Sequence, residues 1–172
     1  DNHFEVQDHR SAFLHELAGL SDLVVVNTRL MADIVRDKTG KTAVVIGDPC
    51  EGARKPPWFS PGKPLRLLWF GRSMNFRYMS TVFPRLVELG KEIPVVCQLV
   101  IDPVRGLEEM IAQLNYSHRP ALNVVLSPWE SPETTSRAFE ECDLVTIPSD
   151  PKDPIKKAAS NNRLTESLWA GR

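Results

Sequence analysis

The sequence is poor in the features of disulfide-linked, zinc-binding and membrane-spanning proteins. Its 172 residues hold three cysteines, Cys50, Cys97 and Cys142, which are odd in number, far apart and without a C-x-x-C pair. This spacing argues against both a disulfide framework and a zinc site. No apolar run approaches the roughly 20 residues that span a bilayer, and the first residues lack the pattern of a signal peptide. We therefore expect a soluble protein of the reducing cytoplasm.

Motifs of other nucleotide-using proteins are missing as well. The sequence has no G-x-G-x-x-G turn, which argues against a dinucleotide oxidoreductase. It has no D-x-D triplet to hold a metal ion on a diphosphate, so we expect no metal and no cofactor. The net charge of -1 gives no support to nucleic-acid binding.

Composition predicts two parts joined by a linker. A hydrophobic share of 42% and a charged share of 25% are typical of a globular protein. Residues 47–64 hold five prolines and three glycines, which indicates a long crossing loop. We predict the end of an N-terminal domain in residues 1–47, a linker in 48–64 and a second domain in 65–172. The chain lacks an initiating methionine and stops where a helix should lead into another strand, so we expect an incomplete piece of a longer protein.

The first part has the pattern of a parallel crossover unit. Residues 22–27 and 42–46 are predicted to be strands, because both are short apolar runs rich in valine. Between them, Thr28 should cap a helix that ends at Gly40. Apolar residues at helical intervals before this unit predict another helix that ends near Gly19.

The second part alternates strands with helices. Buried strands are predicted at residues 65–70, 94–101, 123–126 and 143–147, and each precedes a helical pattern. Pro84 lies inside the first of these helices and should kink or restart it. The alternation predicts the α/β class, with a Rossmann-like parallel sheet that has helices on both faces.

The C-terminal stretch is predicted to be a basic amphipathic helix. From Asn161 onward, Leu164, Leu168 and Trp169 have helical spacing and should pack inward, while Arg163 and Glu166 point elsewhere. From residue 152 to the end, five basic residues stand against two acidic ones, which indicates an anionic partner. Ser160 and Asn161 are candidate caps, and the start of such a helix suits a phosphate group.

Polar residues follow the carboxyl ends of the predicted strands, and open parallel sheets bind ligands beyond these ends. Gly71-Arg72-Ser73 follows the first strand, Trp129 the third, and Pro148-Ser149 the fourth. A glycine lets a ligand approach the backbone, and a guanidinium offers a planar fork to phosphate oxygens. The alternative interpretation of Gly71-Arg72 is a helix-capping turn with a solvated arginine.

Two of these segments carry a family resemblance. LRLLWFGR, at residues 65–72, and NNRLTESLWAGR, at residues 161–172, resemble the donor domain of GT-B-fold glycosyltransferases, and in particular the large retaining group that uses nucleotide sugars. The resemblance implies that residues 65–172 are an incomplete donor-binding half of a GT-B fold, and that residues 1–47 end the acceptor-side domain.

The resemblance also implies roles for single residues. Glu166 matches the glutamate that holds the ribose of the donor. Gly71 and Arg72 match the pair that binds its diphosphate. Further cations for the diphosphate would come from Arg77, Lys156 and Arg163, and the base of the donor would lie near Trp129, Pro148 and Ser149.

The sequence departs from the family pattern at two places. The lysine that usually follows the glycine-arginine pair is missing, and Arg77 is a substitute rather than a match. The first of two glutamates usually separated by seven residues is Ala158 here, so retention or inversion at the sugar carbon stays open. We expect an atypical member of the group.

These observations predict a metal-independent transfer of a sugar from a nucleotide sugar to a carbohydrate, lipid or protein acceptor. No catalytic residue is identified, and the piece alone should be inactive. The resemblance leaves open a peripheral association of the full-length protein with membranes. A nucleotide-sugar epimerase of the same fold and a non-catalytic nucleotide-binding module are the alternatives.

Overall fold

The computed structural model describes residues 9–50, 52–58, 60–150, 152–153, 156 and 161–172. Its contacts divide the chain into two units. Unit 1 comprises Asp1–Cys50 and Ser149–Asn162, and unit 2 comprises Glu51–Pro148 and Arg163–Arg172. Most of the predicted linker therefore belongs to unit 2. Residues 149–162, which we had placed in the second domain, group with unit 1.

Unit 1 contains the predicted crossover. Helix α1 (His9–Leu20) precedes strand β1 (Val24–Val26), helix α2 (Arg29–Thr39) and strand β2 (Ala43–Val45), and the two strands pair in parallel. The Thr28 hydroxyl accepts the Met31 N–H at 3.1 Å, and Gly40 ends the helix in the left-handed conformation at φ 71°. Both predicted helix ends are confirmed.

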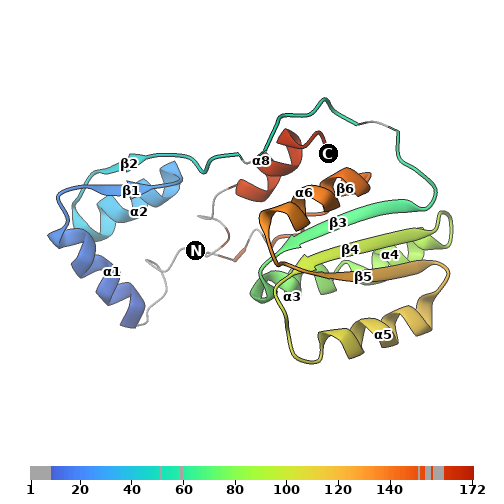
Figure 1. The fold of residues 1–172 in the computed structure, drawn as a ribbon. Coiled ribbons are helices and arrows are strands. Elements are labelled where there is room, and N and C mark those ends of the chain that lie inside the picture. The colour runs from blue at the N-terminus through green and yellow to red at the C-terminus, as the bar shows by residue number, and fades with distance from the viewer. Residues whose placement is uncertain (1–8, 51, 59, 151, 154–155, 157–160) are drawn as a thin grey trace. The chain divides into compact units, whose positions relative to one another are not determined.

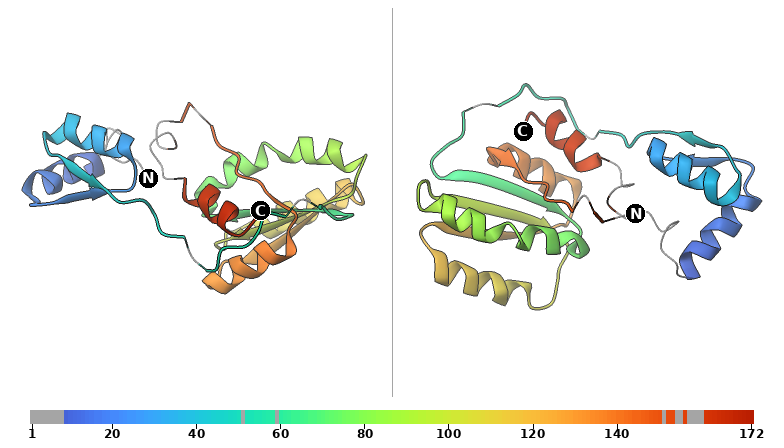
Figure 2. Two further views of the ribbon diagram at one scale, coloured as in Figure 1. Left: turned by 90° about the horizontal axis from the view of Figure 1, so that it is seen from above. Right: turned by 180° about the vertical axis from the view of Figure 1, so that it is seen from behind.

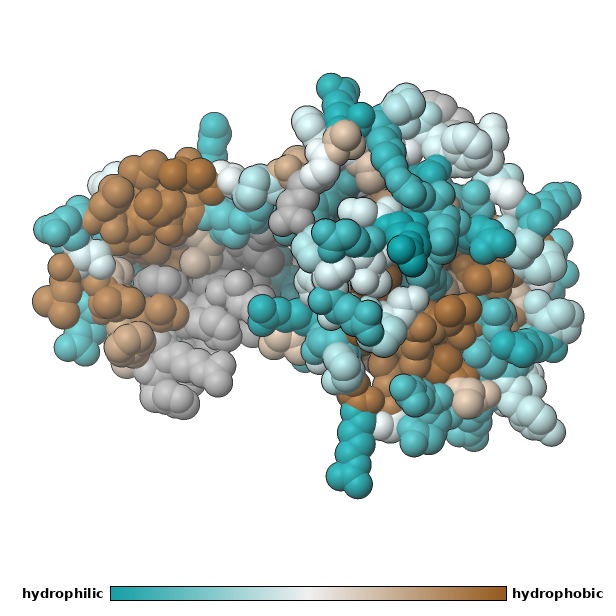
Figure 3. All heavy atoms as spheres, in the orientation of Figure 1, coloured by the Kyte–Doolittle hydropathy of each residue, from teal (hydrophilic) through white to brown (hydrophobic). Residues whose placement is uncertain are grey.

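Apolar side chains lie exposed on unit 1. Ile34 and Val35 of α2 are buried, but several large apolar residues are not, namely Phe13, Leu17, Leu20, Leu23, Val25, Val44, Val45 and Ile46. Brown atoms gather over this unit in Figure 3. Parallel sheets are normally covered on both faces. In unit 1 the two-stranded sheet and its helices are too small to cover these side chains.

Unit 2 is built on a parallel sheet of four strands (Figure 1). The strands are β3 (Leu65–Gly71), β4 (Val95–Ile101), β5 (Leu122–Pro128) and β6 (Leu144–Val145), in the order β5-β4-β3-β6. Residues 67–71 of β3 are all buried, which explains why this strand is a nearly continuous apolar run. The predicted Rossmann-like α/β fold is confirmed.

Helices cover both faces of this sheet, as the view from above in Figure 2 shows. Helices α3 (Phe76–Ser80), α4 (Phe83–Gly90) and α5 (Leu107–His118) pack on the face that carries Leu67 and Trp69. Helix α6 (Pro132–Glu141) packs on the face that carries Leu68 and Phe70, where Ala170 also lies. Helix α8 (Asn162–Trp169) precedes Ala170.

Pro84 restarts the helix after β3, which was one of the two predicted outcomes. The chain passes from β3 through the short 3-10 turn η1 (Ser73–Asn75) into α3, which ends at Ser80. Helix α4 begins at Phe83, with Pro84 in its first turn. Proline is tolerated there because the first helical N–H groups have no intrahelical partner.

The side chain of Asn115 pairs with the backbone of β5. Its Nδ2 donates to the Val124 carbonyl at 2.8 Å, and its Oδ1 accepts the Val124 N–H at 2.7 Å. This pair of bonds imitates a neighbouring strand. Strand β5 is at the edge of the sheet, so these two backbone groups of Val124 have no neighbouring strand on that side. The side chain of Asn115 forms hydrogen bonds with both of them.

Every helix in the described part of the chain is too short or too polar to cross a lipid bilayer.

Candidate functional site

The end of β3 is the point where the strand order of unit 2 reverses. From β3 the chain moves to β4 and then β5 on one side, whereas β6 pairs with the opposite side of β3. Open α/β sheets bind ligands at such a reversal, beyond the carboxyl ends of the strands. Gly71 ends β3 and Arg72 follows it. Thr146 follows β6, and its N–H donates to the Leu68 carbonyl at 2.8 Å.

Helix α8 turns a different face to the sheet from the one that the sequence predicted. Leu164 and Leu168 are 49% and 64% exposed, so the prediction that they pack inward was wrong. Ser167 is buried instead. Its hydroxyl donates to the Arg163 carbonyl at 2.6 Å, so the polar group is satisfied within the helix. Arg163 lies one turn before Ser167, so both residues share the buried side of α8.

The guanidinium of Arg163 lies over Gly71. If residue 71 had a Cβ atom, that atom would lie 3.6 Å from Nη1 of Arg163. Gly71 is buried and has a φ of 152°, a conformation that residues with side chains rarely adopt. Glycine is therefore needed here for its backbone conformation.

The Arg163 side chain is half-buried. Its Nη1 has no hydrogen-bond partner among the described residues. Burial lowers the pKa of Arg163, whereas the charge of Glu166 acts to raise it. An arginine remains protonated in proteins despite such a shift, so a positive charge with an unused donor persists beside Gly71.

A second unused donor lies beneath the same glycine. The indole of Trp69 is fully buried, and its Nε1 has no hydrogen-bond partner in the described part of unit 2. The ring atoms Cζ2 and Cη2 lie 3.6 and 3.7 Å from the position of the absent Cβ of Gly71. Buried donors without partners are uncommon in folded proteins. Arg163 and Trp69 thus place two unsatisfied donors near Gly71.

The turn after β3 is held by a carboxylate that the sequence analysis did not single out. Asp102 follows β4 and accepts the Ser73 N–H at 2.6 Å and the Ser73 hydroxyl at 2.7 Å. Partial burial acts to raise the pKa of Asp102, but the bonds from Ser73 and the charge of Arg72 outweigh it, so that the pKa is lowered. An aspartate directly after a buried strand was the available signal. Asp102 fixes the backbone on which Arg72 stands.

Arg72 and Glu166 lie on the two elements that the resemblance assigns to donor binding, the end of β3 and α8. Arg72 is exposed at the end of β3. Glu166 is half-buried on α8, one turn after Arg163. Of the predicted residues, the structure brings Gly71 and Arg163 together. The two segments that carry the family resemblance therefore meet at the end of β3.

The remaining predicted residues are more scattered. Arg77 lies on α3 with its guanidinium 4.8 Å from the ring centre of Tyr78 and bonded to the Tyr78 hydroxyl at 2.6 Å. Trp129 follows β5, is 44% exposed, and donates its backbone N–H to the Ile101 carbonyl at 3.0 Å. Its exposure is too high for a core residue.

Pro148 is half-buried at the end of the β6 segment. Ser149 and Lys156 belong to unit 1, where the Lys156 N–H donates to the Asp153 carbonyl at 3.0 Å. Their predicted roles stay predictions. Ser160, a candidate cap of the last helix, lies outside the described residues.

The described residues contain no group of three or more histidine, cysteine or acidic side chains arranged to hold a metal ion. Comparison with known protein families and with curated proteins finds no match to this chain.

Proposed function

We propose that this chain is the donor-binding part of a glycosyltransferase that uses a nucleotide sugar and needs no metal ion. The observation that carries the proposal is the Arg163 guanidinium, whose Nη1 is buried without a partner over Gly71. It lies at the reversal of strand order, which is where open α/β sheets bind ligands.

A nucleoside diphosphate fits the charge at this place. Its diphosphate oxygens would accept bonds from Arg163 and Arg72. Each bond from a cation to such an oxygen contributes roughly 1.5 to 3 kcal/mol. When the sugar leaves, negative charge grows on the diphosphate, and two fixed guanidinium groups would stabilise it without a metal.

Glu166 would then bind the ribose. Residues three apart on a helix have Cβ atoms about 5 to 6 Å apart, so one nucleotide can contact both Arg163 and Glu166. A carboxylate accepts hydrogen bonds from both ribose hydroxyls. The base would extend from there towards Pro148 or Trp129. Trp129 follows β5, which is two strand spacings, or about 10 Å, from β3.

Thermal unfolding of the full-length protein with UDP, GDP, ADP and their sugars tests this proposal. One nucleotide should raise the unfolding temperature, and Glu166→Ala should abolish that increase. Leu164→Ala is the matched control, because Leu164 lies exposed on the same helix. If no nucleotide stabilises the wild-type protein, the proposal is wrong.

Activity assays separate the alternatives. Sugar interconversion without any acceptor would indicate an epimerase of the same fold. Nucleotide binding without transfer or interconversion would indicate a binding module.

A further inference from the structure

Residues 52–58, here called the strap, lie against the C-terminal end of α8. The Lys55 N–H donates to the Trp169 carbonyl and the Trp58 N–H to the Gly171 carbonyl, both at 2.9 Å. The carbonyls at the end of a helix have no intrahelical partner, so the strap supplies the donors that the helix lacks. In return, the indole Nε1 of Trp169 donates to the Gly52 carbonyl at 2.9 Å.

The turn that ends α8 is shaped to accept the strap. The Arg172 N–H donates to the Ser167 carbonyl at 2.8 Å and the Gly171 N–H to the Leu168 carbonyl at 3.1 Å, which is the Schellman pattern. Gly171 has the left-handed φ of 77° that this pattern requires. A Cβ on residue 171 would lie 2.2 Å from the Pro56 carbonyl oxygen, so the close contact with the strap also requires glycine.

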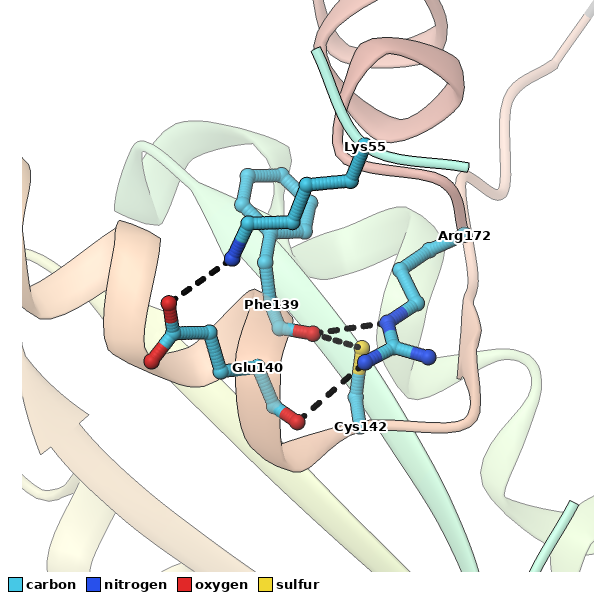
Figure 4. A network of polar contacts seen from close by, with 5 residues as sticks. All are labelled: Lys55, Phe139, Glu140, Cys142 and Arg172. Atoms are coloured by element: carbon cyan, nitrogen blue, oxygen red, sulfur yellow. Dashed lines mark hydrogen bonds and ion pairs between the residues drawn. The ribbon is translucent and has the colours of Figure 1, made fainter. Parts of the chain in front are cut away.

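Arg172 joins this turn to α6 (Figure 4). Its Nε donates to the Phe139 carbonyl at 2.8 Å and its Nη2 to the Glu140 carbonyl at 3.2 Å. The guanidinium carbon lies 5.4 Å from the ring centre of Trp58 in the strap. Lys55 of the strap forms an ion pair with Glu140 at 2.7 Å. We call the strap, residues 171–172 and the end of α6 together the clasp.

The clasp holds α8 at the end opposite to Arg163. Eight residues separate Arg163 from Gly171, which corresponds to about 12 Å along a helix axis. A tilt of about 5° around the clasp would therefore move Arg163 by about 1 Å, which is enough to lose a hydrogen bond.

We propose that the clasp is a positioning element: it fixes the axis of α8 so that the Arg163 guanidinium stays over Gly71. What Arg163 binds rests on the function proposed above, whereas the effect of the clasp on α8 does not. Trp169 is the positioning residue that can be changed most conservatively, because phenylalanine keeps an aromatic ring beside Arg54 and removes only the donor to Gly52.

Trp169→Phe in the full-length protein tests the proposal in two ways. Amide hydrogen exchange in residues 164–169 should become faster, while exchange in β3 and β4 stays unchanged. The dissociation constant of the nucleoside diphosphate selected by the thermal panel should rise about fivefold to tenfold, as expected when one hydrogen bond that holds the site is lost. Leu168→Ala is the matched control on the exposed face of α8 and should change neither quantity.

A double-mutant cycle decides whether the clasp acts through Arg163. In an Arg163→Met background, Trp169→Phe should weaken diphosphate binding no further, whereas a purely structural role would leave its full effect in place. A full additive effect, or unchanged exchange in α8, overturns the proposal. If neither a nucleoside diphosphate nor pyrophosphate binds the wild-type protein, the proposed function fails, and the exchange measurement alone decides on the clasp.

Discussion

Replacing Arg163 by methionine should stabilise the ligand-free protein and weaken nucleotide binding at the same time. Methionine keeps the length of the apolar stem and removes a half-buried charge whose Nη1 has no partner among the described residues. A buried polar group without a partner costs about 1 to 3 kcal/mol. Part of that gain is offset, because Arg163 also interacts favourably with the charge of Glu166. We therefore expect the free energy of unfolding to rise by about 1 kcal/mol.

Denaturant titration followed by tryptophan fluorescence measures this change in the relevant unit. The four tryptophans, Trp58, Trp69, Trp129 and Trp169, all belong to unit 2, so their emission reports on that unit. Leu168→Met is the control, because it places the same side chain on the exposed face of the same helix.

Although Arg163→Met should make the protein more stable, it should weaken binding of the diphosphate. Loss of one charge-assisted bond, worth about 1.5 to 3 kcal/mol, should raise the dissociation constant of the diphosphate by roughly 10-fold to 150-fold. Calorimetric titration of the same variant measures it. A variant that unfolds more easily than the wild type, or that binds the nucleotide equally well, would refute the view of Arg163 as a charge held ready for a ligand.

Three further predictions concern unit 2. Gly71→Ala should lower the free energy of unfolding by about 1 to 3 kcal/mol, because φ at 71 is strained for any other residue. Calorimetry should also show weaker diphosphate binding. If neither the free energy of unfolding nor the affinity changes, Gly71 does not have the proposed role. Asn115→Ala should destabilise unit 2 by about 1 to 3 kcal/mol in a denaturant titration, because the N–H and the carbonyl of Val124 lose their side-chain partner. Asn123→Ala is the control, and an effect of Asn115→Ala no larger than that of the control would contradict this prediction. Burial raises the pKa of the Cys97 thiol from 9.0 to about 12. Since the folded-state value is the higher one, the stabilisation is complete below pH 9 and declines as the pH rises towards 12. The denaturant midpoint should therefore fall more between pH 8 and pH 10.5 for the wild type than for Cys97→Ala. An equal fall in both proteins would contradict the role of the Cys97 thiol.

The sheet of unit 2 was predictable because its central strands, β3 and β4, are buried along most of their length. A strand such as β3 must then be apolar along nearly its whole length, and that is visible as a run in the sequence. The restart at Pro84 was predictable for a similar local reason, since proline lacks the N–H that a helix interior needs.

The orientation of α8 was not predictable from apolar periodicity. The buried side of α8 carries Ser167 rather than Leu164 or Leu168, and the Ser167 hydroxyl is satisfied by the Arg163 carbonyl. Leucines at helical spacing are therefore exposed, and the arginine that we expected to point elsewhere lies over Gly71. Hydropathy does not register a buried polar group that is satisfied within its own helix.

Asp102 and the clasp were missed for another reason. Both depend on contacts between residues far apart in the sequence, such as Ser73 with Asp102 and Pro56 with Gly171. A linker rich in proline and glycine predicts a loop, but its composition does not say against which element the loop packs. Only the folded chain brings these partners together.

The indole N–H signals of the full-length protein test the central claim most directly. A diphosphate at Gly71 would change the surroundings of the buried Trp69 ring, whose Cζ2 lies 3.6 Å from the position of the absent Gly71 Cβ, so the Trp69 signal should shift in a ¹⁵N–¹H correlation spectrum as the nucleotide is added. Trp69→Phe identifies that signal by its loss from the spectrum. A saturable shift of the Trp69 signal that Arg163→Met abolishes would agree with the account, whereas nucleotide binding that leaves this signal in place would contradict it.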